Sequence, residues 1–465
     1  MRPFAVLHFG FKWAGILLVL VPTLAAAKHL PPVDKLELLE LLKAVQFEEL
    51  NAQLLKYHGE FESGEASDYR LNYALSAFAT TDSEVIEPLN RWVEAYPASE
   101  IPLLARSKRN KHLAHIARGE YAISETPRER LNEMGRHLTM AAVDAARAIE
   151  LNPGATVAYA ILIDVAMYKS NSLGRKRLAD SGLANAPTSD LIRHAYLGSL
   201  LPWWGGSLEE IRAFIIESKT TLPAPVDGYS LDGHEHYVKG LLAVRNGRRK
   251  EAMVHFNRAL NFGERLIYLL ARARNSSVLR EGDSGRADFM RSLEFAPQSP
   301  GILDAVADFL ASNDEFQEAF RLWELALKLD PWNPVILRHR AFHRFRIGKF
   351  EHALEDFDRS MVLGALDHRN RFERGRLHLM ALEDREAAQT DLEIATRVAP
   401  ARALYWYHYA EALTEGPNSE APECRAVQAF ERFLELCQEG SDCNGNQVVT
   451  ARFFTTERPL LYGSC

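Results

Sequence analysis

The chain has 465 residues, of which 47% are hydrophobic and 25% are charged, and these proportions are ordinary for a globular protein. This length exceeds a single ordinary core, so we expect a solenoid or about two to three packed helical regions. The balance of 55 basic and 62 acidic residues gives a formal net charge of −7, which supplies no general attraction to nucleic acid. Binding to polyanions such as nucleic acid is therefore not expected.

The N-terminus has the pattern of a secretory signal peptide. Arg2 and Lys12 precede an apolar run over 13–24, and an A-x-A cleavage site ends at Ala27. The competing interpretation is an uncleaved membrane anchor, but the run is short for a span of about 20 residues. We expect a signal peptide over 1–27, export to the periplasm or beyond the cell, and no stable membrane span after cleavage.

Residues 28–232 are predicted to form a helical N-terminal domain. Apolar residues recur at helical spacing over 30–64. Further along, Pro97 ends one helix and Ser99 is placed to cap the next. A long hairpin near 101–153 ends in ELNPG and has alanines spaced as in the second half of a repeat unit, so it is predicted to be a divergent repeat.

The stretch PWWGGS leads into another helix of this domain. Ser207 and Glu210 form a capping box, which predicts a tight corner at the start of the helix. Trp203 and Trp204 have two interpretations. We favour packing of this corner against neighbouring helices, and the alternative is an aromatic platform for a ligand.

Small residues recur with a fixed period over 233–436. On the first segment of each unit they lie 33 to 35 residues apart, at Gly240, Ala273, Ala307, Ala341, Gly375 and Ala410. The second segments carry a matching series at Ala252, Gly285, Ala319, Ala353, Ala388 and Ala426, mostly followed four residues later by a large apolar residue. Two helices of about a dozen residues cannot bury their apolar faces alone, so this period predicts about six stacked helical hairpins.

These residues resemble the tetratricopeptide repeat family. The unit over 300–333 carries the small, aromatic and proline residues of that family in register, at Ala307, Ala319, Trp323, Ala326 and Pro331. Other units depart from the pattern, with Gly285 and Ser360 at small-residue positions and extra residues near 416–422, so they should pack less tightly or have longer loops. The resemblance implies an all-α solenoid.

The N-terminal region resembles an uncharacterised bacterial helical domain family that precedes such repeats. The stretches that carry this resemblance are FEELNAQLLKYHGEF, RWVEAYPASEIPLLA and PWWGGSLEEI, and it covers roughly 40–220. It implies an architecture and no activity.

All four cysteines lie in the C-terminal segment, at Cys424, Cys437, Cys443 and Cys465. An even number in an exported protein predicts two disulfides. If 424–437 is one helix, its two sulfur atoms are about 20 Å apart, which is beyond disulfide reach. Of the two remaining arrangements we favour Cys437 with Cys443 and Cys424 with Cys465, which would staple the tail over 437–465. Metal binding is the competing interpretation, and no CxxC pair supports it.

The sequence contains no phosphate-binding glycine loop, GxSxG elbow, HExxH helix or context for a nucleophilic cysteine. Three histidine pairs could be considered as metal ligands, namely His112 with His115, His234 with His236, and His339 with His343. Each pair needs a third converging ligand, so solvated or core-edge histidines are the favoured interpretation. We therefore expect no enzymatic activity, no cofactor and no metal.

In tetratricopeptide repeats the first helices line a concave groove, and the resemblance selects the corresponding positions here. They are Tyr237, Arg274, Asp304, Asp308, Arg338, Phe342, Arg346, Phe372, Arg376 and Tyr407. Arginine forks hold carboxylates and aromatic rings give rigid contact area, which suits an extended peptide with acidic groups. The alternative for several of these residues is packing against the adjoining repeat.

The sequence thus predicts a non-catalytic scaffold or assembly factor of the cell envelope that binds a protein or peptide partner in this groove. The second hypothesis is an enzyme or small-ligand receptor with a pocket near Trp92, Tyr96, Trp203 and Trp204 in the N-terminal domain. A third is self-association of the repeats.

Overall fold

The computed structural model describes residues 32–119, 126–222, 229–279, 282–364, 367–414, 424–438 and 443–457. The expected signal peptide lies outside these residues, so it stays a prediction. All contacts reported below lie within one compact unit, Asp34–Cys465. The described residues contain helices and no strand, as the sequence predicts.

The N-terminal part of the described chain contains ten α-helices before the long repeat series begins. They are α1 (Lys35–Lys43), α2 (Phe47–Glu62), α3 (Tyr69–Leu75), α4 (Ile86–Ala95), α5 (Glu100–Arg118), α6 (Arg128–Leu151), α7 (Thr156–Tyr168), α8 (Ser172–Asn185), α9 (Asp190–Ser199) and α10 (Leu208–Thr221). Short 3-10 turns lie at Ser76–Phe78, Ser83–Val85 and Pro202–Trp204.

The remaining helices follow in regular succession. They are α11 (Tyr229–Arg245), α12 (Arg249–Asn261), α13 (Leu266–Leu279), α14 (Gly282–Phe295), α15 (Pro300–Ser312), α16 (Phe316–Leu329), α17 (Pro334–Arg346), α18 (Phe350–Gly364), α19 (His368–Met380), α20 (Arg385–Val398), α21 (Ala403–Leu413), α22 (Cys424–Gln438) and α23 (Gly445–Arg452). A π-helical turn, Phe453–Glu457, follows α23.

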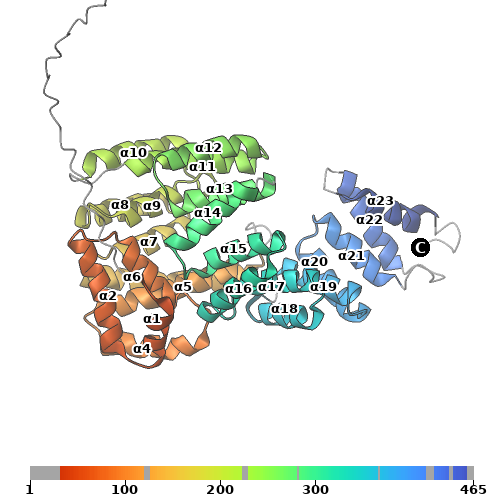
Figure 1. Ribbon diagram of the computed structural model, residues 1–465, viewed down its shortest axis with the longest axis horizontal. Coiled ribbons are helices and arrows are strands. Elements are labelled where there is room, and N and C mark those ends of the chain that lie inside the picture. The colour runs from red at the N-terminus through yellow and green to blue at the C-terminus, as the bar shows by residue number, and fades with distance from the viewer. Residues whose placement is uncertain are drawn as a thin grey trace, which may run out of the picture. The chain divides into compact units, whose positions relative to one another are not determined.

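Helices α11 to α22 pack as successive pairs, which Figure 1 shows as hairpins lying side by side. The tightest contacts join α11 to α12, α13 to α14, α15 to α16, α17 to α18, α19 to α20 and α21 to α22. Smaller contacts join first helices of neighbouring pairs, such as α15 and α17. The predicted stacking of helical hairpins is therefore confirmed.

The periodic small residues lie where the two helices of a hairpin approach most closely. A Cβ atom added to Gly240 would lie 2.4 Å from the ring of Phe256, and one added to Gly375 would lie 2.8 Å from Leu392. Ala307 and Ala319 are fully buried in the same way. The large residue four positions after each small one thus fills the space that the small residue of the partner helix leaves.

Local signals in the sequence account for several helix starts. Asn333 accepts hydrogen bonds from the backbone nitrogens of Val335 and Ile336 at the start of α17. Ser207 caps α10 by accepting from Glu210 N at 3.1 Å, as the capping box predicts.

Within the N-terminal part, α5 and α6 form the most extensively packed hairpin of the described chain. The hydroxyl of Ser107 on α5 donates to the carbonyl of Ala141 on α6 at 2.7 Å, with both residues fully buried. These helices cover the segment of the predicted divergent repeat, which stays a prediction.

The N-terminal helices contact three successive turns between the hairpins of the repeat series. In the turn before α13, Arg265 forms an ion pair with Asp190 at 2.7 Å. In the turn before α15, the backbone nitrogen of Gln298 donates to the hydroxyl of Tyr73 at 2.8 Å. In the turn before α17, Asp330 contacts Thr81 and His112.

The side chain of Asp330 is completely buried in this contact. Its Oδ1 accepts hydrogen bonds from Thr81 N at 2.7 Å and from Thr81 Oγ1 at 2.6 Å. Its Oδ2 lies 2.8 Å from His112 Nε2 and accepts from Asn333 Nδ2 at 2.7 Å. Burial raises the pKa of Asp330, but the charge and hydrogen bonds of its partners outweigh burial and hold the pKa below its usual value. The carboxylate therefore stays ionised and ties the N-terminal helices to the repeats.

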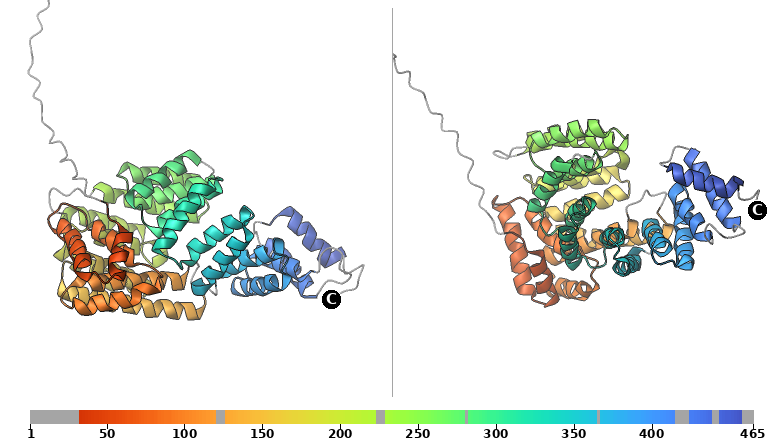
Figure 2. Two further views of the ribbon diagram at one scale, coloured as in Figure 1. Left: turned by 60° about the horizontal axis from the view of Figure 1, so that its bottom comes forward. Right: turned by 45° about the vertical axis from the view of Figure 1, so that its right-hand side comes forward.

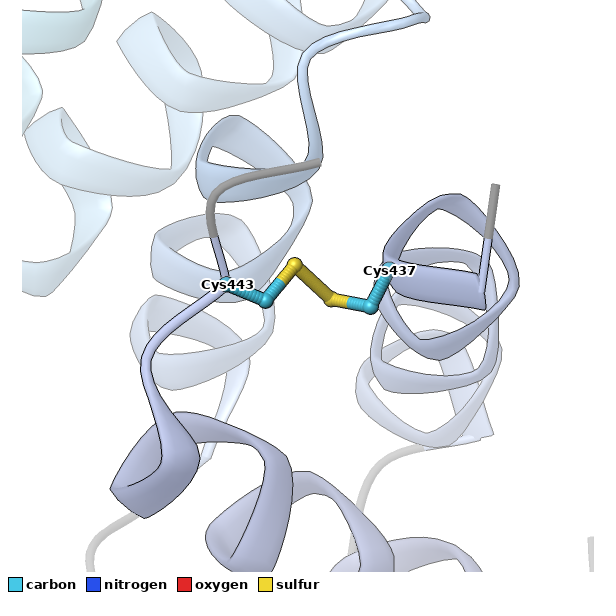
Figure 3. The surroundings of a disulfide bond; sticks show 2 residues. All are labelled: Cys437 and Cys443. Carbon is cyan, nitrogen blue, oxygen red and sulfur yellow. A yellow bond between two sulfur atoms is a disulfide. The ribbon is translucent and has the colours of Figure 1, made fainter. Parts of the chain in front are cut away.

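At the C-terminal end, α23 packs on α22. In Figure 2 these two helices are the dark blue ones near the C-terminus. A disulfide joins Cys437 at the end of α22 to Cys443 just before α23, with 5.8 Å between their Cα atoms (Figure 3). This is one of the two disulfides that we favour from the spacing. The other includes Cys465, which lies outside the described residues, so it stays a prediction.

Apolar packing reinforces this connection. The ring of Phe454 in the π-helical turn stacks on that of Phe430 in α22, with 5.0 Å between the ring centroids. Ala451 of α23 is fully buried in the same cluster. The C-terminal segment thus covers the apolar end of the repeat series.

In the described part of the chain, no helix is both long enough and apolar enough to cross a membrane.

Candidate functional site

A pocket of about 870 Å³ opens on the first helices of three successive hairpins. Its charged lining consists of Arg274 from α13, Asp304 and Asp308 from α15, and His339 from α17. Its apolar lining includes Val278 and Phe309. The pocket therefore brings together three residues of the predicted groove, namely Arg274, Asp304 and Asp308.

Asp304 lines this pocket from α15. It is buried, and its Oδ1 accepts a hydrogen bond from Trp323 Nε1 at 2.9 Å. His339 Nδ1 lies 3.0 Å from the other carboxylate oxygen. Burial lowers the pKa of His339. The charge of Asp304 and the hydrogen bond to it raise the pKa by a larger amount, so the pKa lies above its usual value.

Asp308 lies one turn further along α15 and keeps 47% of its side chain exposed. His343 Nε2 lies 2.9 Å from its Oδ1. Burial raises the pKa of Asp308, but the bond to His343 and nearby positive groups outweigh burial and lower the pKa overall. Asp308 is therefore a negative charge that a ligand in the pocket can reach.

Arg274 is an exposed cation of this pocket. Among the described residues it makes no hydrogen bond or ion pair, so its guanidinium group is available to a ligand. The pocket thus offers an anion and a cation on neighbouring helices, with apolar surface between them.

The other three arginines of the predicted groove have partners within the chain. Arg338 is buried, and its Nη1 lies 3.8 Å from Asp367. Arg346 is exposed and lies 3.5 Å from Asp314. Arg376 forms an ion pair with Glu373 at 2.9 Å. These arginines would have to give up an internal contact before they held a partner's carboxylate.

The aromatic residues of the predicted groove pack mostly inside the hairpin stack. Phe372 is buried and stacks on Tyr405 with ring centroids 4.3 Å apart. Tyr237 packs against Tyr268 at 5.3 Å. Phe342 is half-buried and contacts His343 edge to face at 5.2 Å. The contacts of Phe372 and Tyr237 follow the alternative of packing against the adjoining repeat, whereas Phe342 contacts the next residue of its own helix.

Tyr407 is buried among Phe430 and Phe433 and borders a second pocket of about 520 Å³. That pocket lies near the C-terminal end and also includes His408, Glu411 and Phe454. His408 Nδ1 lies 2.8 Å from Glu411 Oε2, so these two side chains are paired with each other.

Two histidines that contact the aspartates of the first pocket were not among the predicted groove residues, and one of them, His339, also lines the pocket. His339 and His343 each follow an aspartate of the pocket by 35 residues and contact it directly. This spacing is one residue more than the repeat of 34, so the period itself carries the signal that would have found them. The sequence suggested them as solvated or core-edge histidines, with metal ligands as the alternative, whereas each faces a carboxylate on the neighbouring hairpin.

The remaining histidine pairs also have other neighbours. His112 contacts Asp330, and His115 Nδ1 lies 3.2 Å from the hydroxyl of Tyr168. His234 is buried, while His236 stacks on Phe262. Within the residues that the structure describes, no group of three or more histidine, cysteine, aspartate or glutamate side chains is arranged to hold a metal ion.

The aromatic residues proposed for a pocket in the N-terminal domain belong to separate surroundings. Trp92 is fully buried between Phe47 and Phe78. Trp204 contacts Tyr168, with ring centroids 5.4 Å apart. Trp203 is exposed, and neither of the two pockets described above includes any of these residues.

Residues 35–172 match a family described as a domain of unknown function, DUF4034. The comparison with curated protein sequences gives no significant match.

Several solved structures are similar in fold. A thermophilic tetratricopeptide repeat protein of Thermus thermophilus is 17% identical, covers 39% of this chain and 98% of its own, and has a TM-score of 0.35. A tetratricopeptide repeat protein of Parabacteroides merdae is 15% identical, and the match covers 63% of this chain and 98% of that protein, with a TM-score of 0.41. A chain of the Cut9–Hcn1 hetero-tetramer of the APC/C is 13% identical, and the match covers 81% of this chain and 69% of that one, with a TM-score of 0.44. The solved structures that the chain resembles thus include tetratricopeptide repeat proteins, and its residues 35–172 match the uncharacterised DUF4034 domain.

Proposed function

We propose that this protein is a non-catalytic scaffold that binds an extended segment of a partner protein in the pocket on α13, α15 and α17. The observation that carries the proposal is the pocket of about 870 Å³, which lies on the first helices of three successive hairpins. A surface built from equivalent helices of neighbouring repeats continues along the stack, which suits an extended chain better than a compact small molecule.

The chemistry of the pocket favours a peptide with mixed side chains. Arg274 can hold a carboxylate of the partner through a forked pair of hydrogen bonds. Asp308 can accept from a basic side chain, and Val278 and Phe309 offer apolar contact between the two charges. Opposite charges on neighbouring helices would fix the direction in which the segment lies.

The proposal includes export from the cytoplasm. It rests on the charged start, the apolar run over 13–24 and the A-x-A site that ends at Ala27. N-terminal sequencing of the protein recovered from an envelope fraction should begin at Lys28. A protein recovered from the cytoplasm with Met1 in place would contradict this part of the proposal.

Site-specific photocrosslinking tests the binding surface. A photoreactive amino acid would replace Val278, which lines the pocket and is 59% exposed, or Val254, which is 49% exposed on α12, a second helix. We expect the substitution at Val278 to capture a specific protein from envelope extract, and that at Val254 to capture none of it. Equal capture at both positions would show that the pocket is not the binding surface.

A further inference from the structure

Helix α5 carries a row of basic side chains on one face. Lys108, Lys111, His115 and Arg118 follow one another at helical spacings of three, four and three residues, which place them on adjacent turns of the same face. None of the four is fully buried, and His115 is exposed. We call these four residues the α5 basic row.

The α5 basic row faces α7 and α3. Lys111 contacts the carboxylate of Asp164, and the hydroxyl of Tyr168 lies 3.2 Å from His115 Nδ1. The guanidinium group of Arg118 lies 5.9 Å from the ring centroid of Tyr168 and 5.4 Å from that of Trp204. Lys108 donates a hydrogen bond to the neutral amide oxygen of Asn72 on α3.

The positive charge of this surface exceeds its negative charge. Asp164 is the carboxylate that pairs with the row, whereas Lys111 and Arg118 are cations and Lys108 is a third basic group that a nearby anion would hold protonated. The charge of Lys35 on α1 adds to the repulsion at Lys108. Burial, with the charge of Lys111, lowers the pKa of Lys108 to about 7, and burial lowers the pKa of Lys35 to about 7. An anion placed here would relieve this repulsion.

We propose that the α5 basic row is a docking surface for a short acidic peptide segment of a partner protein. The row extends from Lys108 to Arg118, a helix length of about 15 Å, which matches four to five residues of extended peptide at about 3.3 Å each. Lys108, Lys111 and Arg118 would each hold a carboxylate, and the rings of Tyr168 and Trp204 would cover the stem of a side chain.

A short acidic peptide fits better than nucleic acid. The row provides few cations, and the chain has a net charge of −7, which repels a long polyanion from the surrounding surface. The site lies on the N-terminal helices and shares no residue with the pocket on α13, α15 and α17. It is therefore a second surface, independent of the proposed function.

Fluorescence anisotropy with labelled hexaglutamate tests this site on the mature chain, with hexaglutamine as the uncharged probe. We expect saturable binding of hexaglutamate at low ionic strength and none of hexaglutamine. The double variant K108M/K111M should bind hexaglutamate at least about tenfold more weakly, because two hydrogen bonds to charged groups are lost. The variant K111R keeps the cation and should bind as the parent does.

The matched control is K250M/K328M, which removes the same charge from two exposed lysines on α12 and α16. Equal weakening by this control would overturn the proposal, because it would show attraction to overall charge alone. Absence of saturable binding, or tighter binding of a hexanucleotide than of hexaglutamate, would overturn it as well. Circular dichroism would verify that each variant is folded.

The outcome is separable from that of the proposed function. The variant R274E alters the pocket and leaves the α5 basic row intact, so it should bind hexaglutamate as the parent does. Loss of partner capture at Val278 with normal hexaglutamate binding would reject the pocket alone, and the reverse result would reject the α5 basic row alone.

Discussion

At the scale of single residues, the hairpin stack depends on positions where only a very small side chain fits. Gly240 is the clearest case, since an added Cβ atom would lie 2.4 Å from the fully buried ring of Phe256. Phe256 is enclosed by its neighbours and cannot move away without disturbing the packing.

We predict that Gly240→Ala destabilises the protein by about 1–3 kcal/mol, because the overpacking outweighs the gain in helix propensity. Gly59→Ala is the matched control, since a Cβ atom there meets nothing within 4 Å and Gly59 lies in the last turn of α2. That change should be neutral or stabilise by up to about 1 kcal/mol. Urea unfolding measures both, and equal effects would contradict the packing argument.

A second prediction at this scale concerns the buried amine of Lys35. Its side chain is 1% exposed and lies against the ring of Tyr73, and burial lowers its pKa from 10.5 to about 7. Between these two values the unfolded chain holds a proton that the folded chain releases, so stability rises with pH across this window. The cost of the buried charge is therefore fully present below pH 7.

Lys35→Met removes that charge, so it should stabilise the protein more at pH 6 than at pH 10. The comparison is made by urea unfolding, with the exposed Lys328→Met as the control that should show no such difference. The same stability change at both pH values would mean that Lys35 is not a buried cation.

At the scale of helices, the contact of Asp330 with the N-terminal helices is the strongest polar link that we identify. We predict that Asp330→Ala costs about 3–5 kcal/mol, because it leaves the donors of Thr81 and Asn333 buried without a partner. Asp358→Ala removes an exposed ion pair with Arg374 and should cost no more than about 1 kcal/mol. A similarly small loss at Asp330 would show that the N-terminal helices are not held there.

The disulfide between Cys437 and Cys443 should act on its own element rather than on the whole chain. It closes a short loop, so its removal in C437A/C443A should cost about 2 kcal/mol. Hydrogen exchange should become faster in α22 and α23 and stay unchanged in α15. Faster exchange throughout the repeats would contradict a local role.

At the scale of the whole molecule, the period of small residues was sufficient to predict the all-α architecture and the stacked hairpins. A repeated close approach of two helices leaves a mark in every unit, as at Gly240 and Gly375. The contact of Asp330 with Thr81 and His112 could not be predicted in this way. Thr81 lies 249 positions before Asp330 and His112 lies 218 positions before it. Neither Thr81 nor His112 belongs to the repeat pattern.

The candidate site was predictable only in part, for a related reason. Repeat register identifies the face of a helix, and three of the residues that it selected, Arg274, Asp304 and Asp308, line one pocket. It does not show whether a side chain already has a partner within the chain. Arg338 lies against Asp367, and Phe372 stacks on Tyr405, and both partners come from outside the groove pattern.

The measurement that tests partner binding in this pocket most directly is the affinity of the partner captured at Val278 for a chain whose pocket is filled. Ala305→Trp places a large ring in the pocket between Asp304 and Asp308, while Lys328→Trp adds the same ring to an exposed position on α16. We predict that Ala305→Trp weakens binding at least about a hundredfold and that Lys328→Trp leaves it unchanged. Unchanged affinity in the folded Ala305→Trp variant would contradict the claim that this pocket holds the partner.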